Sequence, residues 1–322
     1  MQLNKMQDDR DNAASHIPVL ADELTGLLDP QPQDTVIDGT FGAGGHARRV
    51  GSSLGQDALF IGIDRDPVAG RHFELFAQYQ PFRCRFIQGN FADAFQELAE
   101  KGFEADLVYL DLGVSSMQLD RPERGFSYSY DAPLDMRMDP DSKLTARKIV
   151  NEWPPEELAR IFKAYGEERY ARAIARRIAA ERRQAPLETT LQLVDTIKAA
   201  IPTPARFGAG HPARRVFQAL RIAVNDELSS LSRGLEHAFD VLAPGGRMAV
   251  ISFHSLEDRI AKKFFAARVG KCTCPPDLPK CVCKAKAQLR VITRRPVTPS
   301  LEEMSANPRS QSAKLRVAEK LR

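Results

Sequence analysis

Short apolar runs recur through the first part of the chain, each bounded by turn-forming residues. Runs of about four to eight such residues are typical of buried strands in a parallel sheet. They are TVIDGT, ALFIGID, RCRFIQG and DLVYLDLG, at residues 35–40, 58–64, 83–89 and 106–113. Between the first two, HARRVGSSLG predicts a short helix that ends at a glycine. Strand-helix-strand units of this kind predict a mostly parallel α/β sheet.

The strand pattern stops near Ser116 and resumes near residue 236, where LEHAFDVLAPGGRMAVISF predicts a helix, a turn and another buried strand. The residues between contain the helical segments PEELARIFKAYG, ERYARAIARRIAAERR and TLQLVDTIKAAI, with no clear strand. We therefore predict an α/β domain in two parts, residues 1–119 and 216–322, interrupted by a helical insertion at residues 120–215.

Composition agrees with a globular protein, since the 322 residues are 43% hydrophobic and 27% charged. No apolar run approaches the roughly 20 residues of a membrane helix. The first sixteen residues are polar and lack the apolar core of a signal peptide. We expect a soluble, cytoplasmic protein that is large enough for an enzyme with a cleft.

Positive charge is concentrated toward the C-terminus. Residues 259–322 contain 16 Lys or Arg and 4 Asp or Glu, so they carry +12, whereas residues 1–258 carry −8. A cationic segment suits a nucleic acid, because phosphates supply much of the affinity in such complexes. The alternative is a solvated basic tail.

A glycine-rich loop follows the first predicted strand, in VIDGTFGAGGH at residues 36–46. Loops at the carboxyl ends of parallel strands bind ligands. A dinucleotide fold would have G-x-G-x-x-G directly after the strand, whereas here Asp38 comes first and would disfavour a pyrophosphate. A carboxylate attracts the ammonium or sulfonium of S-adenosylmethionine, so this cofactor is favoured. A dinucleotide and a purely structural turn are the alternatives.

Three further features favour S-adenosylmethionine. Asp64 ends the second strand, where an acid can accept hydrogen bonds from ribose hydroxyls, although such acids are also common in turns. Phe91 can flank an adenine ring or belong to the core. The turn in LAPGGRMAVISF recurs in the S-adenosylmethionine-dependent methyltransferase fold. We therefore predict this Rossmann-like, mostly parallel α/β fold with a helical insertion domain.

Asp111 ends the fourth strand, where such folds usually perform their chemistry. An exocyclic base amine is a poor nucleophile, and a carboxylate that accepts its hydrogen bonds would favour the positive charge that develops on methylation. Asp111 can act in this way or can hold the cofactor.

The segment SFHSLEDR is expected at the carboxyl end of the fifth strand. His254 can orient the substrate or relay a proton, because the pKa of histidine lies near neutrality. The alternative is helix capping, since Ser255 and Asp258 have the Ser-x-x-Asp spacing of a helix start.

Arg169, Arg172 and Arg176 recur at one-turn spacing in the predicted insertion. This stripe can follow RNA phosphates or can be an ordinary solvated face.

Four of the five cysteines lie in CTCPPDLPKCVC, at Cys272, Cys274, Cys281 and Cys283. Two C-x-C pairs around a Pro-rich turn suggest structural zinc, although C-x-C is tighter than the usual C-x-x-C. Free thiols and a redox role are the alternatives, and disulfides are disfavoured in a reducing cytoplasm. The spacing does not decide between them, and no metal ligand is assigned.

The motifs taken together resemble the bacterial ribosomal small-subunit methyltransferase H family, which methylates N4 of a cytidine in the decoding centre of 16S rRNA. They occur in order between residues 16 and 317 as HIPVL, DGTFGAGGH, DRDP, LDLGVSSMQLD, RGFSY, PLDMRMD, YGEERYARAIAR, FQALRIAVNDEL, LAPGGR, ISFHSLEDR and NPRSQSAKLR. One departure is Gln311, where the family commonly has Arg, and it puts a single RNA contact in doubt.

The resemblance implies an S-adenosylmethionine-dependent methyltransferase whose partner is 16S rRNA within the 30S subunit. It also implies the residues that contact the cofactor, which are Gly44, Gly45 and His46 in the loop, Asp64 on the ribose side, Phe91 near the adenine, and Asp111 and Gln118 closing the pocket. Two rival functions are a DNA amino-methyltransferase of the same fold and a non-enzymatic nucleic-acid binder. The first usually has Asp/Asn-Pro-Pro-Tyr/Phe where this chain has Asp-Leu-Gly-Val.

Overall fold

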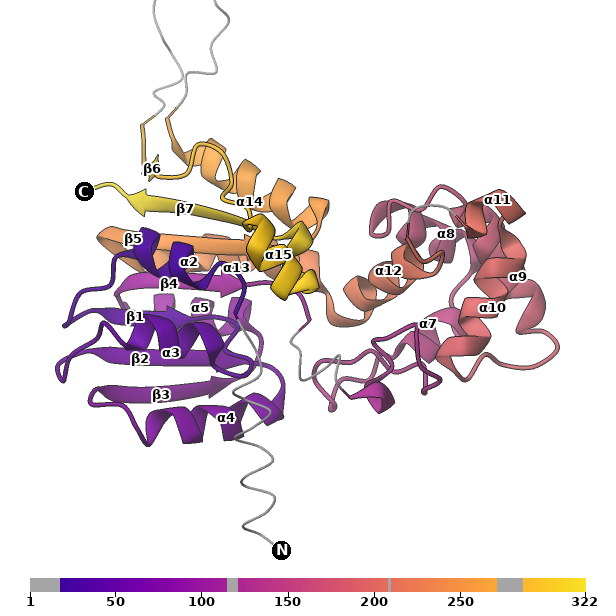
Figure 1. The fold of residues 1–322 in the computed structure, drawn as a ribbon, viewed down its shortest axis with the longest axis horizontal. Coiled ribbons are helices and arrows are strands. Elements are labelled where there is room, and N and C mark those ends of the chain that lie inside the picture. Colours follow the sequence, from indigo (N-terminus) through magenta and orange to yellow (C-terminus); the bar gives the residue numbers. More distant parts are fainter. Residues whose placement is uncertain (1–17, 115–120, 208–209, 271–285) are drawn as a thin grey trace, which may run out of the picture. The chain divides into compact units, whose positions relative to one another are not determined.

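The protein is described by a computed structural model that covers residues 18–114, 121–207, 210–270 and 286–322 (Figure 1). The chain divides into two compact units. One consists of Met1–Gly113 with Leu228–Arg322, and the other of Val114–Glu227.

A seven-stranded sheet forms the centre of the first unit, with the strand order β3-β2-β1-β4-β5-β7-β6. Strands β1 to β5 are parallel, whereas β7 runs antiparallel to both β5 and β6. The five parallel strands are those predicted from the sequence. The strands are β1 (Thr35–Asp38), β2 (Leu59–Asp64), β3 (Arg83–Gln88), β4 (Ala105–Asp111), β5 (Leu242–Ser252), β6 (Leu289–Val291) and β7 (Lys314–Lys320).

Helices cover both faces of this sheet, because the buried side chains of a strand alternate between its faces. On one face, Ile61 and Ile63 of β2 join the core formed with α5, α13 and α14. On the other, Phe60 packs against Phe76 of α4, with ring centroids 5.2 Å apart. The helices of this unit are α2 (Ala21–Leu28), α3 (Gly45–Gly51), α4 (Pro67–Ala77), α5 (Phe91–Glu100), α13 (Glu227–Val241), α14 (Ser255–Arg268), α15 (Leu301–Ala306) and the 3-10 turn η2 (Pro308–Ser312).

The end of the basic C-terminal segment is part of the sheet, so the alternative of a solvated basic tail is wrong for β7. β7 lies between β5 and β6, and its residues Leu315, Val317 and Ala318 are fully buried. Residues 315–318 are buried in succession, so both faces of β7 are covered in the middle of the strand. The positive charges of β7 therefore belong to a strand of the sheet.

The second unit is helical in the described residues, as predicted, and has its own core around Leu158, Phe162 and Ile174. It extends to Glu227, beyond the predicted limit at residue 215, because Phe217 and Leu220 of α12 pack into this core. Its elements are η1 (Pro122–Arg124), α7 (Ala146–Glu152), α8 (Pro155–Ala164), α9 (Ala171–Glu181), α10 (Thr190–Ala200), α11 (Thr203–Arg206) and α12 (Arg214–Asn225). Among the described residues, no helix of either unit is long and apolar enough to cross a bilayer.

Candidate functional site

The candidate site lies at the carboxyl ends of β1 and β4, where the strand order of the sheet reverses. The chain after β1 is joined to β4 by two hydrogen bonds. The Gly39 N–H donates to the Tyr109 carbonyl across 2.9 Å, and the Asp111 N–H donates to the Thr40 hydroxyl across 2.7 Å. Ligands of open α/β sheets bind in the crevice at such a reversal point.

His46 and Asp111 meet at this point. His46 lies in the first turn of α3, and its Nε2 is 3.3 Å from Asp111 Oδ2. Burial lowers the pKa of His46, but the nearby carboxylates of Asp111, Asp38 and Glu303 outweigh it, so the net shift of this pKa is upward. These carboxylates therefore favour the protonated form of the His46 imidazole.

Asp38 is the buried acid of the cluster, with only 1% of its surface exposed. Its Oδ1 accepts a hydrogen bond from the Thr40 N–H at 3.0 Å. Burial raises the pKa of Asp38 to about 7, against the opposing effects of the Thr40 N–H, Tyr109 and His46. Asp38 also raises the pKa of His46 by its charge. Its attraction of a cationic ligand stays a prediction.

Polar atoms of the cluster are free to meet a ligand. His46 Nδ1 and Asp111 Oδ1 are buried and have no hydrogen-bond partner among the described residues. Buried polar groups are nearly always hydrogen-bonded in folded proteins. A polar ligand that carries both donors and acceptors would satisfy these atoms, and S-adenosylmethionine is such a molecule.

The glycine loop has a structural basis of its own. Gly42 and Gly44 have φ values of 56° and 74°, in the left-handed region that favours glycine. A Cβ at Gly44 would lie 2.7 Å from the Phe41 ring, and one at Gly45 would lie 3.2 Å from Pro18. Close packing and backbone conformation therefore require glycine at position 44, whether or not a ligand is bound.

Asp64 fixes this loop to the end of β2. Its Oδ2 accepts from the Gly42 N–H and its Oδ1 from the Asp66 N–H, both at 2.8 Å. Burial raises the pKa of Asp64 to about 6, although these two hydrogen bonds lower it. Each carboxylate oxygen retains a second lone pair, so Asp64 can still accept hydrogen bonds from a ribose.

Phe91 lies in the core. It is 8% exposed, its ring centroid is 6.3 Å from that of Phe95, and a Cβ at Gly234 of α13 would lie 2.3 Å from its ring. This environment supports the alternative that Phe91 is a packing residue, and its contact with adenine stays a prediction.

Gln118 lies outside the described residues, as do Cys272, Cys274, Cys281 and Cys283.

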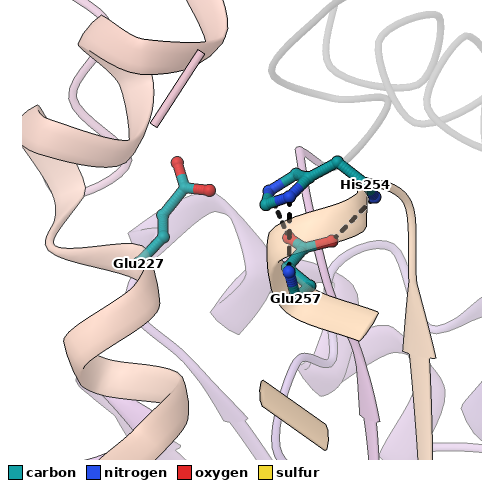
Figure 2. Close-up of side chains that lie close together, drawn as sticks. All are labelled: Glu227, His254 and Glu257. Atoms are coloured by element: carbon teal, nitrogen blue, oxygen red, sulfur yellow. Dashed lines mark hydrogen bonds and ion pairs between the residues drawn. The ribbon is translucent and has the colours of Figure 1, made fainter. Parts of the chain in front are cut away.

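His254 caps α14 (Figure 2). Its Nδ1 accepts from the Glu257 N–H at 3.4 Å, its Nε2 lies 3.1 Å from Glu257 Oε1, and Glu257 Oε2 accepts from the Phe253 N–H at 2.8 Å. The capping alternative is therefore supported, but the residue that caps is His254, with Glu257 in place of Asp258, because the helix begins at Ser255. A role for His254 in chemistry stays a prediction.

The helical unit presents the predicted arginine stripe to solvent. Arg169, Arg172 and Arg176 are exposed, and within the described part of the chain none of them pairs with a carboxylate, whereas Arg177 pairs with Glu181 at 2.6 Å. Unpaired cations of this kind are available to phosphates.

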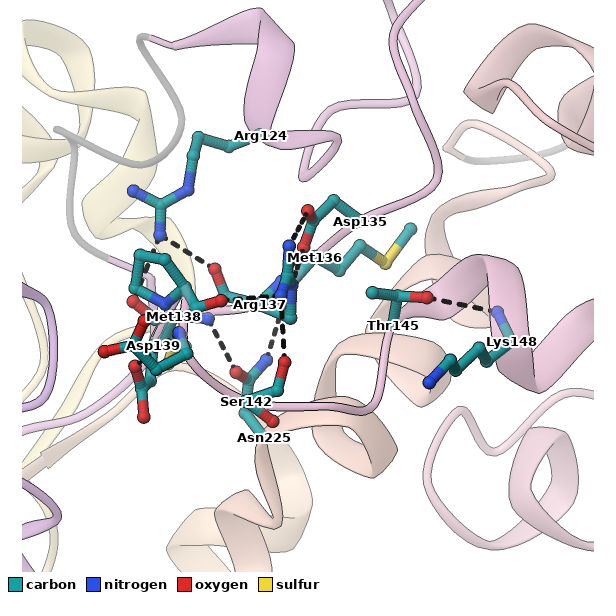
Figure 3. Close-up of polar contacts among 12 residues, drawn as sticks. Arg124, Asp135, Met136, Arg137, Met138, Asp139, Ser142, Thr145, Lys148 and Asn225 are labelled. Carbon is teal, nitrogen blue, oxygen red and sulfur yellow. Dashed lines mark hydrogen bonds and ion pairs between the residues drawn. The ribbon is translucent and has the colours of Figure 1, made fainter.

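The helical unit also contains a polar cluster that was not anticipated from the sequence (Figure 3). Asn225 Oδ1 accepts from the Met138 N–H and its Nδ2 donates to the Met136 carbonyl, both at 2.8 Å. Arg124 donates to the carbonyls of Arg137 and Met138. These bonds hold Met136 at a φ of 62°, which non-glycine residues rarely adopt. In the sequence, this loop was marked only by PLDMRMD, one of the motifs that carry the family resemblance.

Comparison with known proteins identifies close relatives. A family model described as the MraW methylase family matches residues 13–321. A ribosomal RNA small subunit methyltransferase H from Heliobacterium modesticaldum is 52% identical over 313 residues, covering 95% of this chain and 99% of that protein. One from Symbiobacterium thermophilum is 53% identical over 312 residues, covering 96% and 98%. Among solved structures, a putative rRNA-methylase from Clostridium thermocellum is 12% identical, with a TM-score of 0.42, and covers 94% of this chain and 95% of that one.

Proposed function

The chain belongs to the MraW methylase family, and from this premise we propose that it transfers a methyl group to N4 of one cytidine in the decoding centre of 16S rRNA. Membership establishes a methyltransferase, with S-adenosylmethionine as the methyl donor, and confirms the family resemblance predicted from the sequence. It also removes the non-enzymatic binder from consideration. The base, the atom and the site on the RNA belong to the proposal.

The observation that carries the proposal is the buried polar cluster at the ends of β1 and β4. Asp111 Oδ2 faces His46, whereas Asp111 Oδ1 is buried and has no partner among the described residues. A free carboxylate oxygen at the end of β4 is placed to accept a hydrogen bond from an amine. An exocyclic N4 amine has two N–H donors, so one can be held while the nitrogen attacks.

The bound cofactor would supply an electrophilic methyl group, which is bonded to its sulfonium sulfur. The Gly42 and Asp64 contacts hold the loop at one side of the site, and Asp111 with His46 forms the other side. Holding the amine in line for displacement contributes several kcal/mol to lowering the barrier. Asp111 would accept hydrogen bonds from the amine and stabilise its developing positive charge, and His46, whose Nε2 lies 3.3 Å from Asp111 Oδ2, would hold the carboxylate in place.

The exposed arginines of α9 suit the RNA phosphates. They would position the rRNA without reading its sequence, as phosphate contacts do. N4 of cytidine is paired in a helix, so the target base must be unpaired or flipped before it can reach Asp111. The names of the relatives, rRNA small subunit methyltransferases, support the same class of substrate.

A DNA amino-methyltransferase is the alternative to be excluded by experiment. Mass spectrometry of nucleosides from 16S rRNA of a strain lacking the gene should show loss of N4-methylcytidine, with return of the modification on complementation by the wild-type gene. Persistence of N4-methylcytidine with loss of another methylated base would refute the proposal. Methylation of naked 16S rRNA, assembled 30S particles and DNA by the purified protein then identifies the substrate.

The role of Asp111 is tested separately. Asp111→Asn should reduce turnover more than it reduces cofactor affinity if the carboxylate acts on the amine. Equal losses in both would assign Asp111 to the cofactor.

A further inference from the structure

An acid from the C-terminal part of the chain lies beside the cofactor site. Glu303 is in the first turn of α15, and its Oε1 accepts a hydrogen bond from the Leu20 N–H across 2.8 Å. The two residues are 283 positions apart in the sequence, so this contact exists only in the folded protein.

The fold creates the need for this contact. Leu20 is almost fully buried and has a φ of 53°, and it begins α2 without a side-chain cap. A buried N–H without a partner is costly, so an acceptor from elsewhere in the chain is required. Ser300 fixes the acceptor, because its hydroxyl caps α15 and accepts from the Glu303 N–H at 3.1 Å.

The segment that Glu303 holds packs on the glycine loop. Pro18 lies two residues before Leu20 and packs close to Gly45. A Cβ added at Gly45 would lie only 3.2 Å from the Pro18 side chain. Gly45 begins α3, and His46 is its next residue. The path from Glu303 to the site therefore runs through residues 18–20 to the start of α3.

Glu303 also acts on His46 by its charge. The groups that face His46 are Asp111 and Tyr109 from β4, Asp38 from β1 and Glu303 from α15. The three carboxylates raise the pKa of His46 against the effect of burial. Glu303 is the one acid of this set that comes from outside the parallel strands.

We propose that Glu303 is a positioning residue of the cofactor site, and that it acts by holding residues 18–20 against the glycine loop. The C-terminal helix α15 thereby completes a site that is otherwise built from the N-terminal half of the sheet. Glu303 does not act on the methyl group.

Two substitutions separate this role from general stability. Glu303→Ala removes the acceptor, whereas Glu303→Gln keeps a carbonyl oxygen that can accept from the Leu20 N–H. Calorimetry with S-adenosylmethionine should give a dissociation constant roughly tenfold higher for Glu303→Ala, the effect expected for a lost hydrogen bond to a charged group, and within about threefold of wild type for Glu303→Gln. Glu302→Ala, at the exposed neighbouring acid, is the matched control and should equal wild type.

Titration of the His46 ring by NMR, without cofactor, gives an independent measurement. Its pKa should fall in both Glu303 variants, because both lose the charge, and should not change in Glu302→Ala. Affinity of Glu303→Ala within twofold of wild type, or an equal loss in Glu303→Gln, would overturn the proposal. If Glu303→Ala does not fold, a dissociation constant for Glu303→Gln more than about threefold above wild type overturns it, because this variant keeps the acceptor for the Leu20 N–H. All these measurements omit RNA, so a wrong RNA substrate would leave their result intact.

Discussion

Arg316 of β7 donates a hydrogen bond from Nε to Asp258 Oδ1 of α14 across 2.7 Å. Lys314 Nζ lies 3.4 Å from the other oxygen of the same carboxylate. Burial raises the pKa of Asp258, but together Arg316 and Lys314 lower it by more, so the net shift of this pKa is downward. Two of the C-terminal cations thus join a strand to a helix, and the one carboxylate offsets half of their positive charge.

Truncation of the C-terminal segment should therefore unfold the sheet unit. Removing residues 305–322 deletes β7, which lies between β5 and β6, and should abolish cooperative unfolding. Leu315→Ala gives a milder test, since Leu315 is fully buried and its truncation should cost about 2–5 kcal/mol of unfolding free energy. Leu321→Ala, at a residue 36% exposed, is the control. A folded, stable truncation would show that β7 is dispensable.

Asp38→Asn should stabilise the protein at high pH. The folded pKa of about 7 lies above the unfolded value of about 3.9, so Asp38 holds its proton longer in the folded state. Its contribution to stability falls as pH rises from about 4 to 7, and above pH 7 the full cost of the buried charge is present. Urea unfolding at pH 8 should show a gain of roughly 1–3 kcal/mol in the variant, shrinking toward pH 4. A gain that does not depend on pH would contradict this explanation.

Asp64→Ala should weaken binding of S-adenosylmethionine through two effects. The ribose loses an acceptor, worth about 1.5–3 kcal/mol for a charge-assisted hydrogen bond, and the Gly42 N–H loses the carboxylate that fixes the loop. Asp57→Ala, at an exposed acid before β2, is the control for calorimetry. Unchanged affinity would rule out the ribose role.

Replacement of Arg172 and Arg176 by Ala should reduce the salt dependence of RNA binding. Each phosphate contact contributes roughly 0.7–0.9 to the slope of log affinity against log salt concentration, so the double variant should lose between about one and two units of slope. Arg160→Ala is the control, because Arg160 is an exposed arginine of the same unit that already pairs with Glu157 at 2.7 Å. An equal slope in wild type and the double variant would make the stripe a solvated face.

Asn225→Ala should destabilise the helical unit. The Met138 N–H and the Met136 carbonyl would lose their partners in a buried loop, at a cost of roughly 1–3 kcal/mol for each group. Thermal unfolding should show a lowered Tm, whereas Gln184→Ala, at an exposed residue of the same unit, should not. A wild-type Tm would mean that the loop 136–138 does not depend on this side chain.

The sequence determined the parallel half of the sheet and the presence of a helical insertion, but not where the insertion ends. Apolar runs bounded by turn residues are local signals, and each of the five predicted parallel strands was found because its period and its boundaries lie within a few neighbouring residues. The family was also found from local signals, because each motif that carries the resemblance is a short run of neighbouring residues. Asp64 and Asp111 were proposed as site residues from their places at strand ends, whereas His46 was implied by the family resemblance alone.

Only the tertiary structure decided what these residues contact. The sequence shows Asp38 at the end of a strand and His46 in the loop after it, but not the shifts of their pKa values. Burial raises the pKa of Asp38, whereas carboxylates that the fold brings near His46 raise its pKa against the effect of burial. β7 has the composition of a basic tail and becomes a strand because β5 and β6 offer hydrogen bonds and the core offers burial for Leu315 and Val317. Glu303 and Leu20 are partners at opposite ends of the chain. Contacts of this kind depend on the closing of long loops, for which no local pattern of residues provides a signal.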